Sequence, residues 1–220
     1  MPHDLPPWQT VYDYFKHWRD DGTWERLNRE LRIEIRESVG KDGEPSAAVL
    51  DSQTVKTTEM GGERGYDAGK KINGRKRFTL VDTLGLLLTV MVVGADVQES
   101  QGARLVLDKV KTWFPRLQKI WADGAYAGTL INWVMTTCHG HPAAGVWVLQ
   151  IIKRTDKAKG FVLLPRRWVV ERTFGWLNRS RRLSKDYERR CDSSETFIYL
   201  AMIHVMTKRL TGQQTRFASS

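Results

Sequence analysis

The chain has 220 residues, 41% of them hydrophobic, and its 35 Lys and Arg outnumber 25 Asp and Glu to give a formal net charge of +10. This size predicts one medium folded domain with a small appendage, and the charge favours a polyanion, above all nucleic acid, over an acidic protein surface. Two distant cysteines indicate neither a disulfide framework nor a structural zinc site, and the longest apolar stretch is too short to span a bilayer. Together with the missing signal segment, these features predict a cytoplasmic protein.

The first predicted elements are two helices within residues 8–38, where apolar side chains recur every three or four positions. Asp21-Gly22 divides the two helices, and the polar segment 40–45 follows them. We therefore expect an N-terminal helical segment at 1–43, a catalytic domain at 44–212 and a tail at 213–220.

Three strands come next, because β-branched and apolar residues dominate the runs 47–51, 77–83 and 86–93. The first ends at Asp51, and the other two form a hairpin around Leu84-Gly85. Residues 52–75 are rich in glycine and charge, which predicts a long loop.

Strands and helices alternate in the rest of the chain. Strands are predicted at 119–123 and 146–152, helices at 100–114, 128–138, 166–183 and 193–210, and a basic loop at 153–160. Ser193 or Ser194 can cap the last helix. This order predicts an α/β fold, with a mixed sheet of about five strands flanked by helices that is ribonuclease-H-like by analogy.

Three acids are the candidate catalytic residues. Asp51 and Asp123 end predicted strands, and Glu171 lies on a predicted helix one position off its apolar stripe. Each alone has an ordinary explanation, as a turn residue, a cap or half of an ion pair, and we assign Asp82, Asp96 and Asp108 to such roles. Because strand-end acids of one sheet can meet in one crevice, the trio predicts a site for two Mg²⁺ or Mn²⁺ ions, which would support phosphoryl transfer.

Basic residues gather in two clusters beside these acids. The first contains Lys70, Lys71, Arg75, Lys76 and Arg77; the second contains Arg166, Arg167, Arg172, Arg179, Arg181, Arg182, Lys185, Arg189 and Arg190. Each could be a solvated face, but two clusters that bracket candidate metal ligands favour DNA as the partner. Among nine tryptophans, most at core spacing, Trp168 and Trp176 flank Glu171 and are the best candidates for DNA contact.

Five linked motifs resemble the transposases of bacterial insertion sequences of the IS-five group, which are DDE enzymes. They are Asp51-Ser-Gln-Thr-Val-Lys-Thr57, Gly65-Tyr-Asp-Ala-Gly-Lys-Lys71, Leu80-Val-Asp-Thr-Leu-Gly-Leu86, Trp121-Ala-Asp-Gly-Ala-Tyr-Ala-Gly128 and Arg166-Arg-Trp-Val-Val-Glu-Arg-Thr-Phe-Gly-Trp-Leu177. The resemblance implies that Asp51, Asp123 and Glu171 form the metal-binding triad. It also implies cleavage at terminal inverted repeats and strand transfer into target DNA, by a homodimer or larger synaptic complex at the nucleoid.

The chain departs from the family pattern in two places. Around Glu171, Arg167 stands where the family has its Arg, but Leu164 and Asn178 replace the family's Tyr and Lys, and Arg179 or Arg182 is the substitute for that Lys. The resemblance also implies further residues before Leu5, so we expect an incomplete N-terminal DNA-binding region and weak transposition. Two alternatives remain open: a DNA-binding repressor of transposition, and a simple nuclease of the same fold.

Overall fold

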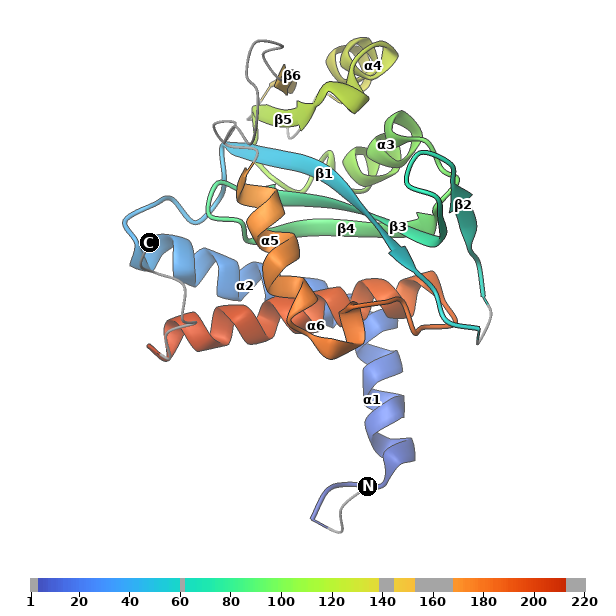
Figure 1. The fold of residues 1–220 in the computed structure, drawn as a ribbon. Coiled ribbons are helices and arrows are strands. Elements are labelled where there is room, and N and C mark those ends of the chain that lie inside the picture. The colour runs from blue at the N-terminus through green and yellow to red at the C-terminus, as the bar shows by residue number, and fades with distance from the viewer. Residues whose placement is uncertain (1–3, 60–61, 139–144, 153–167, 213–220) are drawn as a thin grey trace.

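A computed structural model describes residues 4–59, 62–138, 145–152 and 168–212. It begins with two helices, α1 (Trp8–Asp20) and α2 (Thr23–Ser38), which meet at Asp21-Gly22 as predicted. Gly22 has a φ of +74°, a conformation that glycine adopts without strain, so the chain can turn sharply there. Helix α1 projects from the body, whereas α2 lies along α6 (Cys191–Leu210) (Figure 1).

In the part of the chain that the structure describes, a mixed sheet of six strands forms the centre of the molecule. The strands are β1 (Ala47–Lys56), β2 (Gly65–Asp67), β3 (Ile72–Asp82), β4 (Leu87–Gly94), β5 (Lys119–Asp123) and β6 (Val148–Ile152). Strand β3 pairs antiparallel with β1, β2 and β4, while β5 runs parallel to both β1 and β6. The order β4-β3-β1-β5-β6, with β2 beside β3, is ribonuclease-H-like and confirms the predicted fold class.

The prediction of a long loop at residues 52–75 is wrong for much of that segment. Strand β1 continues five residues beyond Asp51 to Lys56, and β2 and the start of β3 also fall within 52–75. The reason is pairing: Gln53 to Lys56 lie opposite Gly74 to Arg77, so the strands hydrogen-bond along their whole length despite the glycines and charges.

Helices cover both faces of the sheet (Figure 1). On one face, α3 (Glu99–Val110) and α4 (Thr129–Thr137) pack over Ala48, Leu50 and Ile120. On the other, α2, α5 (Trp168–Asn178) and α6 pack over Val49, Val81 and Trp121. Neighbouring residues of one strand alternate between these two cores, as the pleat of a strand requires.

Some predicted ends differ from the structure. Helix α3 ends at Val110, and α5 ends at Asn178 before a short 3₁₀ turn at Arg181–Leu183. Helix α6 begins at Cys191, so Ser193 and Ser194 lie in its first turn instead of capping it; the Ser194 hydroxyl donates a hydrogen bond to buried Asp186 at 2.6 Å. The predicted basic loop at 153–160 lies outside the described residues. The boundary at residue 43 stays a prediction, although Trp24, Leu31 and Ile35 of α2 join the core.

Within the described part of the chain, no helix is both long enough and apolar enough to cross a membrane.

Candidate active site

Asp51 and Asp123 lie at the same level on neighbouring parallel strands. Val49 of β1 pairs with Trp121 of β5, and two residues further along each strand stand the two acids. Side chains two apart on a strand share a face, so both acids lie on the Val49 and Trp121 side of the sheet, under α5 and α6. Because neighbouring strands lie ~4.8 Å apart, the sheet brings the two half-buried carboxyl groups together.

Local hydrogen bonds orient both acids. The Asp123 Oδ1 accepts a hydrogen bond from the Ala125 amide at 2.9 Å, and the Asp51 Oδ1 accepts one from the Ser52 amide at 2.7 Å. Tyr126 lies buried beside them: its burial, and then the negative charges of Asp51 and Asp123, raise its pKa well above the ordinary value. Carboxylates on adjacent strands repel each other, by roughly 4 kcal/mol for a separation of ~4 Å at an effective dielectric of 20, and a cation between them would relieve that repulsion.

Glu171 reaches the same face of the sheet from a helix. It lies exposed in the first turn of α5, one position off the buried stripe of Val170, Phe174 and Leu177, as predicted. In the described residues, however, no three His, Cys, Asp or Glu side chains gather closely enough to hold a metal ion. The strand register therefore places Asp51 and Asp123 on neighbouring strands, and the role of all three acids as metal ligands stays a prediction.

Helix α5 is seated on the β3–β4 hairpin turn, a contact that sequence reasoning missed. Arg172 Nη2 donates to the Leu84 carbonyl at 2.9 Å, and the buried Thr173 hydroxyl donates to the Gly85 carbonyl at 2.7 Å. Gly85 has a φ of +78°, and a Cβ there would meet the Thr173 hydroxyl at 2.8 Å, so only glycine fits. The turn positions the helix that carries Glu171.

Asp82, at the end of β3, holds the same hairpin turn in place. This buried carboxylate accepts hydrogen bonds from the Leu84 and Leu86 amides, both at 2.8 Å, and forms an ion pair with Arg36 of α2 at 2.7 Å. Asp82 therefore has the structural role that the sequence indicated.

The prediction that Arg75, Lys76 and Arg77 contact DNA is not supported by the structure. All three are buried in β3, at 4% exposure or less. Arg75 pairs with Asp186 at 3.0 Å, Lys76 with Glu99 at 3.0 Å, and Arg77 donates to the Leu183 carbonyl at 2.9 Å. Such side chains hold segment 183–189 and α3 on the sheet and cannot reach a phosphate without local unfolding.

Other predicted DNA contacts remain accessible. Lys70, Lys71, Arg179 and Arg182 are exposed. Arg166 and Arg167 lie outside the described residues.

Arg172 and Trp176 are half-buried in a stack of alternating rings and guanidinium groups. The Arg172 guanidinium lies 4.4 Å from the ring centre of Trp168 and 4.8 Å from that of Trp176, and Arg209 of α6 covers Trp176 at 4.1 Å. This stack ties α5 to α6, so packing accounts for Arg172 and Trp176 without DNA.

The structure thus defines the fold class: a ribonuclease-H-like sheet with two acids on adjacent central strands and a third acid on a covering helix. Comparison with known families makes the class specific. The model of the transposase DDE domain family matches residues 42–206, three quarters of the chain, and the chain belongs to that family. A model of IS4/5-family transposases matches residues 1–28. These matches confirm the resemblance to insertion-sequence transposases; a comparison with curated proteins found no match.

Proposed function

We propose that this transposase cuts DNA at the terminal inverted repeats of an insertion sequence and joins the freed 3′ ends to target DNA. The observation that carries the proposal is the placement of Asp51 and Asp123 side by side on β1 and β5. Two carboxylate ligands on rigid, hydrogen-bonded strands suit a hard divalent ion such as Mg²⁺ or Mn²⁺.

In this proposal Asp51, Asp123 and, from α5, Glu171 would hold two divalent ions. When bound, these ions would supply the charge that activates a water or a 3′-hydroxyl and stabilises the leaving oxygen. The protein contributes position: the Ser52 and Ala125 amides orient the aspartates, and the hairpin turn sets the height of α5 above the sheet. Exposed cations such as Lys70 and Arg179 bind phosphates of the substrate.

Transposition needs two DNA ends in one complex, so we propose a dimer or a larger assembly that works at the bacterial nucleoid. With ~8 phosphates neutralised, log affinity for DNA is expected to fall with log salt at a slope of about −7.

The proposal is tested with the purified chain, labelled terminal-repeat DNA, Mg²⁺ and a target plasmid. Asp51→Asn, Asp123→Asn and Glu171→Gln should each abolish cleavage and strand transfer while DNA binding survives. Asp108→Asn is the matched control, because Asp108 is an exposed acid paired with Lys111 on the far face. Strand transfer by Asp123→Asn would overturn the mechanism, binding without Mg²⁺-dependent cutting would indicate a repressor, and cutting without joining would indicate a simple nuclease.

A further inference from the structure

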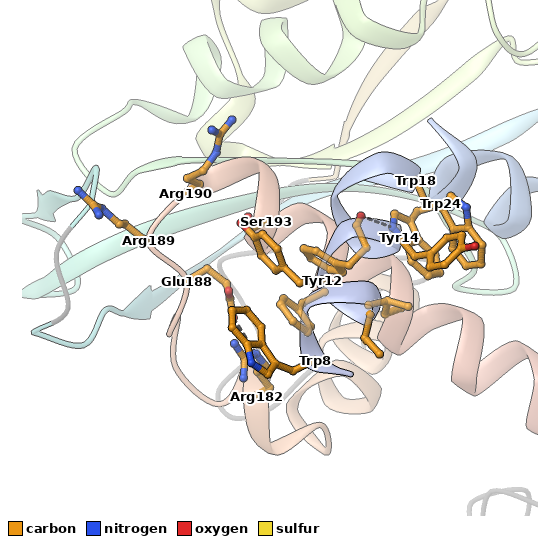
Figure 2. A pocket seen from close by; sticks show the side chains of 14 residues that line it. Trp8, Tyr12, Tyr14, Trp18, Trp24, Arg182, Glu188, Arg189, Arg190 and Ser193 are labelled. Atoms are coloured by element: carbon orange, nitrogen blue, oxygen red, sulfur yellow. Dashed lines mark hydrogen bonds and ion pairs between the residues drawn. The ribbon is translucent and has the colours of Figure 1, made fainter. Parts of the chain in front are cut away.

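An aromatic groove lies away from the three acids, between α1 and the start of α6. Its volume is about 1120 Å³, and half of its lining residues are aromatic (Figure 2). Trp8, Tyr12 and Tyr14 come from α1, and Phe197 comes from α6. Sequence periodicity assigned the α1 rings to a helix face without showing what that face packs against.

Only the second half of α1 is packed on the body. Phe15 and Phe197 stack with ring centres 5.2 Å apart, and Arg19 donates to the Ser193 hydroxyl at 3.1 Å. Towards the start of α1 the rings are open: Trp8 is 61% exposed and Tyr12 53% exposed. A cluster of large exposed rings of this kind is typical of a binding surface.

Arginines stand on the opposite wall of the groove, where Arg182 pairs with Glu188 and Arg190 pairs with Asp192. All six Lys and Arg in residues 179–190 are exposed, and Arg182, Arg189 and Arg190 line the groove itself. The two acids of this segment are already engaged, since Asp186 is buried against Arg75 and Glu188 accepts from Arg182 at 2.7 Å. Arg182 also covers the Phe197 ring at 4.4 Å, so a cation stands directly over the aromatic floor.

Exposed aromatic rings and neighbouring arginines can bind the two parts of a nucleotide, the base and the phosphate. Bases that have left a duplex stack on Trp and Tyr, and phosphates pair with Arg, with little dependence on sequence. The same side chains are frequent in protein interfaces, but the three arginines that line this groove complement a polyanion, and the net charge of +10 attracts DNA. Charge complementarity therefore favours a DNA strand as the occupant.

We propose that this groove binds an unpaired segment of DNA, whose bases stack on Trp8 and Tyr12 while its phosphates contact Arg189 and neighbouring cations. The inference rests on the proposed function, because DNA is the substrate there, and adds a second site for the same strand. Residue Thr57 at the end of β1 bridges to Asp186 of the basic segment. Asp51 lies six residues before Thr57, roughly 20 Å along the strand, so the basic segment begins within about six base pairs' length of Asp51.

The test measures binding without catalysis. The intact chain is titrated in EDTA against fluorescein-labelled 12-nucleotide oligothymidylate and against a blunt 12-base-pair duplex, and fluorescence anisotropy gives both affinities. The double variant Trp8→Ala with Tyr12→Ala should bind the single strand at least tenfold more weakly, because stacking on one ring contributes about fivefold to a hundredfold. Duplex affinity should change less than twofold, since paired bases cannot stack on the rings.

Three controls sharpen the result. Trp8→Phe with Tyr12→Phe keeps the rings and should keep single-strand binding, and Trp113→Ala removes a tryptophan that is 40% exposed outside this groove and should change neither affinity. Arg189→Ala should reduce the steepness of the salt dependence by about one, whereas the ring variants should leave it unchanged.

Equal losses on single strand and duplex, or no loss on either, would overturn the proposal. A shift from dimer to monomer in sedimentation of the double alanine variant, with DNA binding intact, would show instead that the groove joins two copies. None of these readings needs an active enzyme, because all are taken in EDTA, where no divalent ion is available for cleavage. A failure of the catalytic proposal is thereby kept separate from a failure of this one.

Discussion

Replacement of Arg75 by alanine distinguishes a structural cation from a DNA contact. Arg75 is fully buried, and its guanidinium pairs with Asp186 at 3.0 Å and donates to the carbonyls of Glu63, Glu188 and Arg189 at 2.7–2.8 Å. Its removal leaves the carboxylate of Asp186, which has no exposed side-chain surface, without an ion-pair partner from Arg75. Breaking a buried pair in this way costs about 3–5 kcal/mol.

For a domain of this size, such a loss lowers the melting temperature by roughly 6–20 °C. Thermal unfolding followed by circular dichroism measures it, and DNA affinity is titrated against salt below the transition. The salt slope of the folded variant should be unchanged. Arg181→Ala is the matched control, because Arg181 is exposed. Its free energy of unfolding should change by less than about 0.5 kcal/mol, while the slope of log DNA affinity against log salt should become less steep by about one. If Arg75→Ala kept its stability and its salt slope became less steep by one, the structural role of Arg75 would be refuted.

Two further predictions follow from buried polar groups. Thr173→Val removes the hydrogen bond to the Gly85 carbonyl, which should lower the free energy of unfolding by about 1–3 kcal/mol and slow cleavage without weakening DNA binding. Thr173→Ser keeps the hydroxyl and should therefore keep both the stability and the cleavage rate. Equal cleavage rates of the two variants across a Mg²⁺ titration would contradict this. Burial raises the pKa of Cys138 from 9.0 to about 11. The buried, protonated thiol therefore stabilises the folded state fully below pH 9, and this stabilisation is lost as the pH rises to 11. In Cys138→Ala the urea midpoint of unfolding should fall less between pH 9 and pH 11 than in the unmodified chain. Identical dependences of the urea midpoint on pH would exclude this role of Cys138.

Local patterns of the chain predicted most of the secondary structure. The strand at 119–123, the division of the first two helices and the hairpin at Leu84-Gly85 all agree with the structure, because apolar period and turn residues act over a few neighbouring positions. The motifs around Asp51 and Asp123 likewise pointed to the family, since a motif is a property of the sequence itself.

Burial of charge was decided by the tertiary structure. Arg75, Lys76 and Arg77 look like a solvated basic run, yet β3 is flanked by β1 on one side and by β2 and β4 on the other. Glu99 of α3 pairs with Lys76, whereas the segment after α5 supplies Asp186 and backbone carbonyls to Arg75 and Arg77. The partners in that segment lie about a hundred residues away in sequence, so no local pattern reveals them.

The chain by itself determined which side chains carry the chemistry for a metal or DNA site, namely the carboxylates of Asp51, Asp123 and Glu171 and the cations of the two basic clusters. Only the fold decided which of them meet. The parallel register of β1 and β5 places two aspartates side by side, and the packing of α1 leaves Trp8 and Tyr12 open beside Arg189. The physical reason is that side-chain chemistry is carried by each residue, whereas proximity arises from strand pairing and helix packing between segments distant along the chain.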